Sequence, residues 1–136
     1  MFSKSAKYYD EIYAAVKKDY AAEVNKLRKL IQKHKQTGGV RLLDVACGTG
    51  AHASLLNEHF HVEGLDLDAG SLSVARRKCP GAKFHHADMV DFQLKSRFDV
   101  ITCLFSSIGY TRTKSRLQKA IRNMVDHLVP GGVLIV

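Results

Sequence analysis

The segment best suited to bind a ligand is a run of small residues, DVACGTG, from Asp44 to Gly50. Small side chains let a ligand approach the backbone closely, and glycine adopts positive φ without strain. A helical pattern follows the run, and free N–H groups at a helix start bind anions such as an amino-acid carboxylate. The alternative is a tight strand-to-helix turn with no ligand. The predicted contacts in this run are Asp44, Ala46, Cys47, Gly48 and Gly50.

Two aspartates follow the next apolar stretch. Asp66 comes 22 positions after Asp44, close to the spacing at which an acid accepts hydrogen bonds from ribose hydroxyls. Leu67 would then present an apolar face to an adenine ring. Asp68 is expected to cap the following helix. The alternative role for Asp66 is that it too only caps this helix and binds no ligand.

Two further stretches end in candidate contacts. Asp88 could accept a hydrogen bond from an adenine amino group while Met89 packs against the ring, and a plain loop acid is the alternative. The segment 103–110 would line the floor of the cleft, with Cys103 and Leu104 as predicted contacts. Its alternative interpretation is a buried strand end with a polar exit.

Secondary-structure elements must position these candidate residues, and the hydrophobic pattern predicts strands that alternate with helices. Helices are expected first over residues 5–17 and from an Asp19 cap to Gly38-Gly39. Alternating strands and helices imply right-handed crossovers and a parallel sheet, and ligands bind beyond the carboxyl ends of such strands. From residue 40 onward, apolar runs predict strands at 40–47, 61–68, 82–88, 98–105 and 133–136, and helical periodicity predicts helices at 51–59, 71–78 and 113–128, the last ended by Pro130-Gly131-Gly132.

Composition places few limits on function. The chain has 136 residues, 46% of them apolar and 25% charged, as in ordinary globular domains. The net charge of +8 is concentrated in residues 1–39, which hold nine basic and four acidic side chains. Such charge suits a nucleic acid, an anionic small substrate or simply a solvated helix surface. The predicted units are a helical cap over 1–39 and a ligand-binding domain over 40–136.

Three features of the sequence bear on the cellular location of the protein: its three cysteines, its N-terminus and its apolar runs. An odd cysteine count without a Cys-x-x-Cys pair argues against a disulfide framework, and reduced thiols favour a cytoplasmic protein. The N-terminus lacks the apolar core of a signal peptide. The apolar runs are too short to span a bilayer, so no membrane partner is predicted.

Competing cofactor sites lack their signatures. A dinucleotide site needs Gly-x-Gly-x-x-Gly, and the third glycine is missing from the 46–53 segment. No Gly-Lys-Ser/Thr of a phosphate-binding loop occurs. His85 and His86 are adjacent, so on a strand they face opposite sides. No metal site is therefore predicted.

Taken together, the 44–50 run, Asp66 and the Asp88-Met89 pair resemble the motif series of class I S-adenosylmethionine (SAM) dependent methyltransferases, over residues 40–136. The resemblance implies an α/β, Rossmann-like three-layer sandwich with a mostly parallel sheet of order 3-2-1-4-5. It implies SAM as cofactor, S-adenosylhomocysteine (SAH) as product, and direct SN2 transfer of the methyl group. Ala46 replaces the first glycine of the family's loop.

A closer resemblance lies in residues 9–13, 18–23 and 103–109, which are similar to N,N-dimethyltransferases acting on nucleotide-linked amino sugars. It implies that the N-terminal helices fold over the cofactor, with Tyr13 near the reacting methyl and Tyr20 near the methionyl end. Tyr110 stands where that subfamily tends to carry histidine. Tyr13 and Tyr110 are the predicted catalytic residues. For Tyr13 and Tyr20, which lie in the predicted N-terminal helices, the alternative is packing on a helix face.

The resemblance also predicts that strands six and seven are absent, so this chain would be a fragment with little activity. The favoured acceptor is a small amine, and a homo-oligomer is compatible with the sequence. One alternative is an RNA or DNA methyltransferase, which the basic charge allows, although the fourth-strand segment lacks an Asn/Asp-Pro-Pro-aromatic signature. The other alternative is a non-catalytic SAM-binding fragment.

Overall fold

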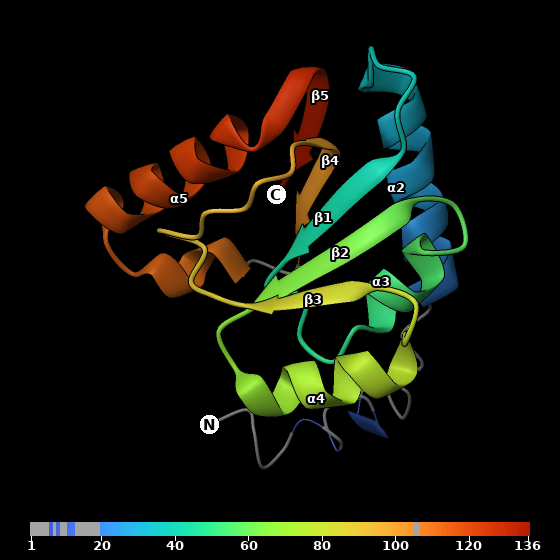
Figure 1. Ribbon diagram of the computed structural model, residues 1–136, viewed down its shortest axis with the longest axis vertical. Helices are drawn as coiled ribbons and strands as arrows, with labels where there is room; N and C mark the ends of the chain where they lie inside the picture. The colour runs from blue at the N-terminus through green and yellow to red at the C-terminus, as the bar shows by residue number, and fades with distance from the viewer. Residues whose placement is uncertain (1–5, 7, 9–10, 13–19, 105–106) are drawn as a thin grey trace.

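The computed structural model describes residues 6, 8, 11–12, 20–104 and 107–136 (Figure 1). Most of the predicted 5–17 helix lies outside the described residues, as do Tyr13 and the expected Asp19 cap. The first complete helix is α2, Tyr20–His34. The division into a cap over 1–39 and a domain over 40–136 stays a prediction.

The described residues form one sheet whose strands run in the order β3-β2-β1-β4-β5, all pairs parallel. The predicted order and the α/β class are confirmed. β4 is buried along its whole length, and β1 and β2 along nearly all of theirs, because helices cover both faces of a parallel sheet. The strands are β1 (Arg41–Val45), β2 (His61–Asp66), β3 (Lys83–His86), β4 (Phe98–Cys103) and β5 (Leu128–Ile135).

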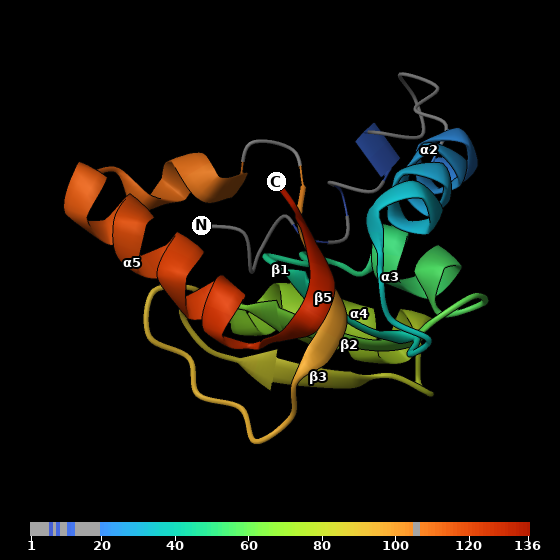
Figure 2. The ribbon, with the colours of Figure 1, turned by 90° about the horizontal axis from the view of Figure 1, so that it is seen from above.

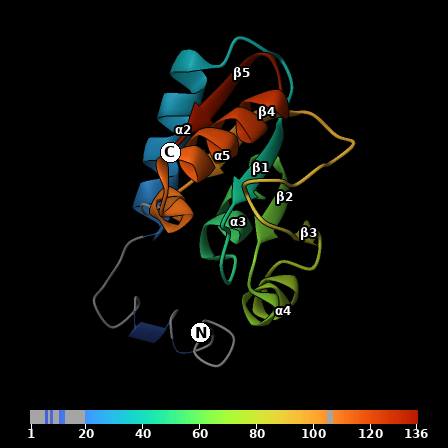
Figure 3. The same ribbon diagram turned by 90° about the vertical axis from the view of Figure 1, so that its left-hand side faces the viewer.

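Helices cover the sheet on two sides, which gives the three layers (Figure 2). One apolar cluster joins the strands to α2, α3 (Ala51–Leu56) and α4 (Ala69–Lys78). A second cluster, on the other face, joins them to α5 (Lys114–Asp126). Figure 3, seen from the side of α5, shows this helix in front of β4. A short 3₁₀ helix, η1 (Ser107–Thr111), precedes α5.

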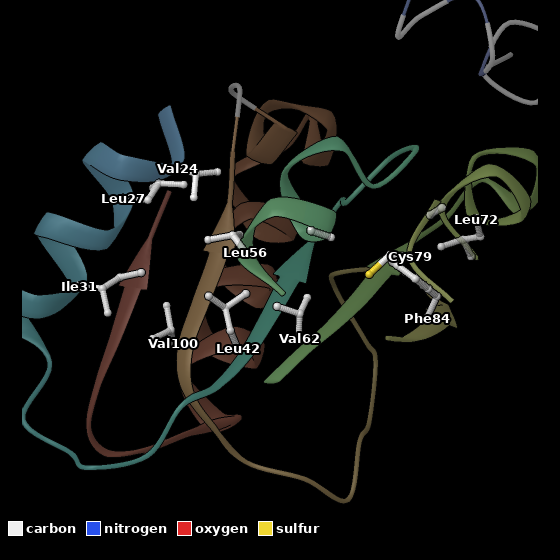
Figure 4. Packing of buried hydrophobic residues seen from close by; sticks show 12 residues of the cluster. Val24, Leu27, Ile31, Leu42, Leu56, Val62, Leu72, Cys79, Phe84 and Val100 are labelled. Carbon is white, nitrogen blue, oxygen red and sulfur yellow. The ribbon is translucent and has the colours of Figure 1, made fainter. Parts of the chain in front are cut away.

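α2 docks through a stripe that its sequence predicts. Val24, Leu27 and Ile31 recur at steps of three and four, so they lie on one face, and all three are buried. Figure 4 shows all three on the side of α2 that faces the sheet, with Ile31 nearest to Val100 of β4. Burying each large aliphatic side chain contributes roughly 1.5–3 kcal/mol. The stripe therefore holds α2 against the sheet.

The fifth strand departs from prediction. It begins at Leu128, paired with Phe98, and pairing resumes at Val133 opposite Val100. The intervening Pro-Gly-Gly segment forms a bulge within β5, where Gly131 has a φ of +83°. The expectation that this segment separates helix from strand is wrong, because a bulge tolerates a proline without an N–H and a glycine in the left-handed region.

Gly64 of β2 lies where no side chain fits. A Cβ there would stand 2.5 Å from Cδ1 of Phe84 and 2.9 Å from Sγ of Cys47. We expect Gly64→Ala to lower the free energy of unfolding by about 1–3 kcal/mol through overpacking, measured by urea denaturation. The control is Gly38→Ala, since a Cβ there would meet no atom within 4 Å. Equal stability of both variants would contradict the proposed crowding.

Candidate functional site

A cavity of about 520 Å³ opens at the carboxyl ends of β1, β2, β3 and β4. This is the edge of the sheet at which parallel α/β folds bind ligands. The predicted site residues that line the cavity are Tyr20, Asp44, Ala46, Cys47, Gly48, Asp66, Leu67, Asp88, Met89, Leu104 and Tyr110.

The turn after β1 is bent by left-handed residues and tied to β2. Ala46 and Gly48 both have a φ of 57°, a conformation that costs a non-glycine residue about 1–3 kcal/mol. The Cys47 N–H donates to the Leu65 carbonyl at 3.0 Å. The neighbouring strand therefore supports the strained turn, which presents its backbone to the cavity.

Asp66 links that turn to the end of β2. Its Oδ2 accepts from the Gly48 N–H at 2.8 Å, and its Oδ1 accepts from the Asp68 N–H at 2.8 Å. Asp68 caps α4 as predicted, because its Oδ2 accepts from the Ser71 N–H at 2.8 Å. The helix begins at residue 69 rather than the expected 71. A carboxylate has further lone pairs, so Asp66 keeps capacity for hydroxyl donors.

Beyond β3, Asp88 is oriented by two partners. Its Oδ1 accepts from the Val90 N–H at 3.0 Å, and its Oδ2 accepts from the Arg116 guanidinium at 2.9 Å. Arg116 lies in the first turn of α5, where Thr113 is the N-cap. Met89 packs against the cluster under α5. The two oxygens of Asp88 are thus fixed in direction at the rim of the cavity.

Asp44 is a buried carboxyl group on the cavity wall with a strongly shifted pKa. Burial raises the pKa of Asp44 to about 7, opposed by a hydrogen bond from the Thr102 hydroxyl and reinforced by the charge of Asp66. The Thr102 Oγ1 lies 2.7 Å from Asp44 Oδ1. Near neutral pH the carboxyl group therefore exchanges between its acid and its carboxylate, which is common at functional sites.

The thiols of Cys47, at the cavity, and of Cys103, in the cluster under α5, are not nucleophiles. Burial raises the pKa of Cys47 well above its usual value, and the charges of Asp44 and Asp66 add to this. Burial likewise raises the pKa of Cys103 to about 12. Both remain thiols at neutral pH, and the thiolate is the reactive form.

α2 reaches the cavity through a side-chain cluster that the sequence did not reveal. His52 Nε2 lies 2.7 Å from Glu23 Oε2, and the ring of Tyr20 meets the His52 ring edge-on at 4.9 Å between centroids. Tyr20 and His52 both line the cavity. The cluster attaches α2 to the first turn of α3.

Two predicted residues, Gly50 and Cys103, lie away from the cavity, and a third is not among the described residues. Gly50 does not line the cavity; it precedes α3 with a φ of 83°, and a Cβ there would stand 3.1 Å from Ala75 Cβ. Cys103 is 1% exposed and packs in the cluster under α5. Tyr13 lies outside the described residues.

Several wall residues were missed by sequence reasoning. Thr49, Ala51 and Leu65 adjoin predicted residues and could have been included on position alone. His52, Arg112 and Arg116 carry no local signal, because their proximity to the cavity depends on contacts between distant segments. The remaining lining residues are Ala6, Asp68, Ser71, Ala87, Val90, Ser107 and Thr111.

Two absences concern the described residues alone. In those parts of the chain, no group of three or more His, Cys, Asp or Glu side chains could hold a metal ion. No helix within the same parts is long and apolar enough to cross a membrane.

Comparison with known proteins agrees with this geometry. Residues 42–132 match the family described as "Methyltransferase domain", so the chain belongs to this methyltransferase domain family. It is 43% identical, over 96% of its length, to dTDP-3-amino-3,6-dideoxy-alpha-D-glucopyranose N,N-dimethyltransferase of Streptomyces fradiae, of which it covers 51%. It is 39% identical to dTDP-3-amino-3,4,6-trideoxy-alpha-D-glucopyranose N,N-dimethyltransferase of Streptomyces venezuelae, covering 96% of this chain and 55% of that one.

Solved structures extend the likeness to three dimensions. The SAM-bound structure of an amino pentose methyltransferase from Micromonospora echinaspora matches with a TM-score of 0.89 and 38% identity, covering 93% of this chain and 54% of that one. The chain therefore spans about half the length of the relatives it matches.

Proposed function

We propose that the protein containing this chain transfers methyl groups from SAM to the amino group of a nucleotide-linked amino sugar. This chain supplies the cofactor-binding half. The observation that carries the proposal is the 2.8 Å hydrogen bond between Gly48 and Asp66. It places the carboxylate after β2 beside the small-residue turn after β1, on the wall of one cavity. The sugar acceptor is supported by the names of the two Streptomyces relatives.

The residues present fit SAM. The cavity volume of about 520 Å³ lies in the usual range for small-molecule sites, about 300–1,000 Å³. A Cβ placed on Gly48 would meet nothing within 4 Å, so the turn has open space beside its backbone. Carboxylates and apolar side chains share the wall, as a nucleoside with hydroxyls and an aromatic base requires.

Each strand end takes a separate part of that ligand. Asp66 would accept from the ribose hydroxyls, and the exposed Leu67 would cover one face of the adenine. Asp88 would accept from the adenine amino group while Met89 packs at the ring. The turn residues Asp44, Ala46, Cys47 and Gly48, together with Tyr20 and Leu104, would hold the amino-acid end.

When bound, SAM would supply a sulfonium methyl group whose carbon a neutral amine can attack directly, forming the C–N bond as the C–S bond breaks and SAH leaves. The chain's own residues would then mainly align the reactants, an effect that lowers such barriers by about 7–11 kcal/mol. Tyr110 lies at the cavity and is 61% exposed. Its hydroxyl can accept a hydrogen bond from an amine, which would orient the nitrogen lone pair. The proposal also includes the prediction that Tyr13 lies near the reacting methyl.

The test has a binding arm and a turnover arm. Calorimetry should detect SAH binding to this chain, and mass spectrometry should detect one or two methyl groups added to a dTDP-amino sugar by the whole protein with SAM. No heat at millimolar SAH would contradict the cofactor assignment. Binding without turnover on any amino sugar would favour the non-catalytic alternative.

A nucleic-acid acceptor rests on one observation, the net charge of +8. Phosphate contacts would make binding strongly salt-dependent. An RNA or DNA affinity that falls steeply with salt, together with methylation of the nucleic acid, would therefore favour a nucleic acid over the sugar as the acceptor.

The three cysteines are free, which supports the proposed cytoplasmic location.

A further inference from the structure

We propose that His52 is a positioning residue: through Glu23 and Tyr20 it holds α2 against the amino-acid end of the bound cofactor. The inference rests on the proposed function, because it names the part of the SAM site that α2 completes. No role is predicted for His52 from the sequence, and Glu23 enters the predictions only as the last residue of the 18–23 segment.

The contact geometry makes His52 the junction of two helices. Glu23 and Tyr20 are three residues apart on α2, so they share one face. His52, the second residue of α3, touches both: its Nε2 is 2.7 Å from Glu23 Oε2, and its ring meets the Tyr20 ring at an interplanar angle of 79°. The His52 side chain is 9% exposed and the Glu23 side chain 34%. A mostly buried histidine thus joins α2 to the helix that follows the small-residue turn.

The order of the strands decides which part of the ligand lies beside His52. β3, β2 and β1 are consecutive in the sheet. Asp88 follows β3 and Asp66 ends β2, so the adenine and the ribose assigned to these residues occupy the first two positions. The remaining part of SAM, its amino-acid chain, must lie over β1 and the turn after it. His52 lies just beyond that turn, Tyr20 contacts its ring, and both line the cavity.

A role in packing alone is the competing explanation. It predicts that removing His52 loosens the whole site. If His52 instead positions Tyr20 at the amino-acid end, removing His52 lowers the affinity for a ligand that contains the amino acid. The affinity for a ligand that lacks the amino acid stays the same. SAH and 5′-methylthioadenosine form this pair, because both contain the thioether nucleoside and only SAH contains the amino acid.

The experiment measures the dissociation constants of SAH and 5′-methylthioadenosine by calorimetry with this chain. His52→Ala is expected to weaken SAH binding about 3- to 10-fold, the worth of an ordinary hydrogen bond. Binding of 5′-methylthioadenosine should change less than about twofold. Glu23→Gln removes the charge of a partly exposed side chain with little risk to folding, and it should weaken the binding of SAH more than the binding of 5′-methylthioadenosine. His59→Ala, an exposed histidine outside the cavity, is the matched control.

Coupling to Tyr20 is tested by a double-mutant cycle. If His52 acts through Tyr20, the Tyr20→Ala/His52→Ala double variant binds SAH no more weakly than Tyr20→Ala alone. Equal weakening of both ligands by His52→Ala or by Glu23→Gln, or unchanged SAH affinity in both variants, overturns the positioning role while leaving the proposed function standing. Failure of the wild-type chain to bind either ligand overturns the proposed function and this inference with it.

Discussion

Replacing Asp66 with alanine is expected to weaken SAH binding by about 10- to 150-fold. The estimate corresponds to about 1.5–3 kcal/mol for hydrogen bonds to a charged group. The physical reason is that the Asp66 carboxylate is assigned to the ribose hydroxyls. In the structure it also accepts from the backbone N–H groups of Gly48 and Asp68, each at 2.8 Å. Alanine therefore removes a ligand contact and a support of the turn at once.

An isosteric variant separates these two effects. Asp66→Asn keeps one acceptor oxygen and replaces the other with an NH₂ group, which cannot accept from a backbone N–H. We expect Asp66→Asn to bind SAH more weakly than wild type and more tightly than Asp66→Ala. Urea denaturation of both variants measures how much support the turn has lost. A large loss of affinity with little loss of stability identifies the direct ligand contact.

The matched control is Asp91→Ala, which removes an exposed carboxylate outside the cavity. Asp91→Ala and Asp66→Ala change the net charge of the chain by the same amount. The two variants therefore have the same long-range electrostatic effect on a charged ligand. SAH affinity within twofold of wild type in a folded Asp66→Ala variant would contradict the ribose assignment. The hydrogen bond between Gly48 and Asp66 would then no longer support the proposed function.

Features set by neighbouring residues could be predicted from the sequence. The Asp68 cap follows from an aspartate directly before a helical pattern, and the structure places its carboxylate on the Ser71 N–H. Alternation of apolar runs with helices predicted the parallel sheet. The strand order came from the resemblance, and the structure confirms it. The strand ends then converged on one cavity because parallel strands share that edge.

Contacts between distant segments could not be predicted in this way. Arg116 is 28 positions from Asp88, and His52 is 29 from Glu23. Neither pair leaves a periodic or motif signal, because each depends on how a helix docks against a segment that is distant in the sequence. The Pro-Gly-Gly segment shows a second limit. Its residues suit a turn or a bulge equally well, and the pairing of β5 with β4 decides between them.

The buried carboxyl group of Asp44 is expected to make stability fall as pH rises from about 4 to about 7. Burial raises the pKa of Asp44 from 3.8 to about 7. In that window the folded chain holds a proton that the unfolded chain has released, so the free energy of unfolding decreases with pH. The full loss is about 4 kcal/mol. Above pH 7 both states are ionised there, and this contribution becomes constant.

Asp44→Asn isolates this contribution, because asparagine stays neutral at every pH and keeps an oxygen for the Thr102 hydroxyl. The measurement is urea denaturation of both proteins at intervals from pH 4 to pH 8. The variant should gain stability relative to wild type as pH rises, up to about 4 kcal/mol. Asp91→Asn, at an exposed position, controls for the change in net charge.

Thr102→Val provides a second, independent test of the same carboxyl group. The Thr102 hydroxyl donates to Asp44 Oδ1 at 2.7 Å and lowers the pKa of Asp44. Without that donor the pKa should rise further, so the fall in stability should extend to higher pH than in wild type. A difference between wild type and Asp44→Asn that stays constant from pH 4 to pH 8 would contradict the raised pKa. It would mean that the carboxylate is solvated well enough at the base of the cavity to ionise with its ordinary pKa.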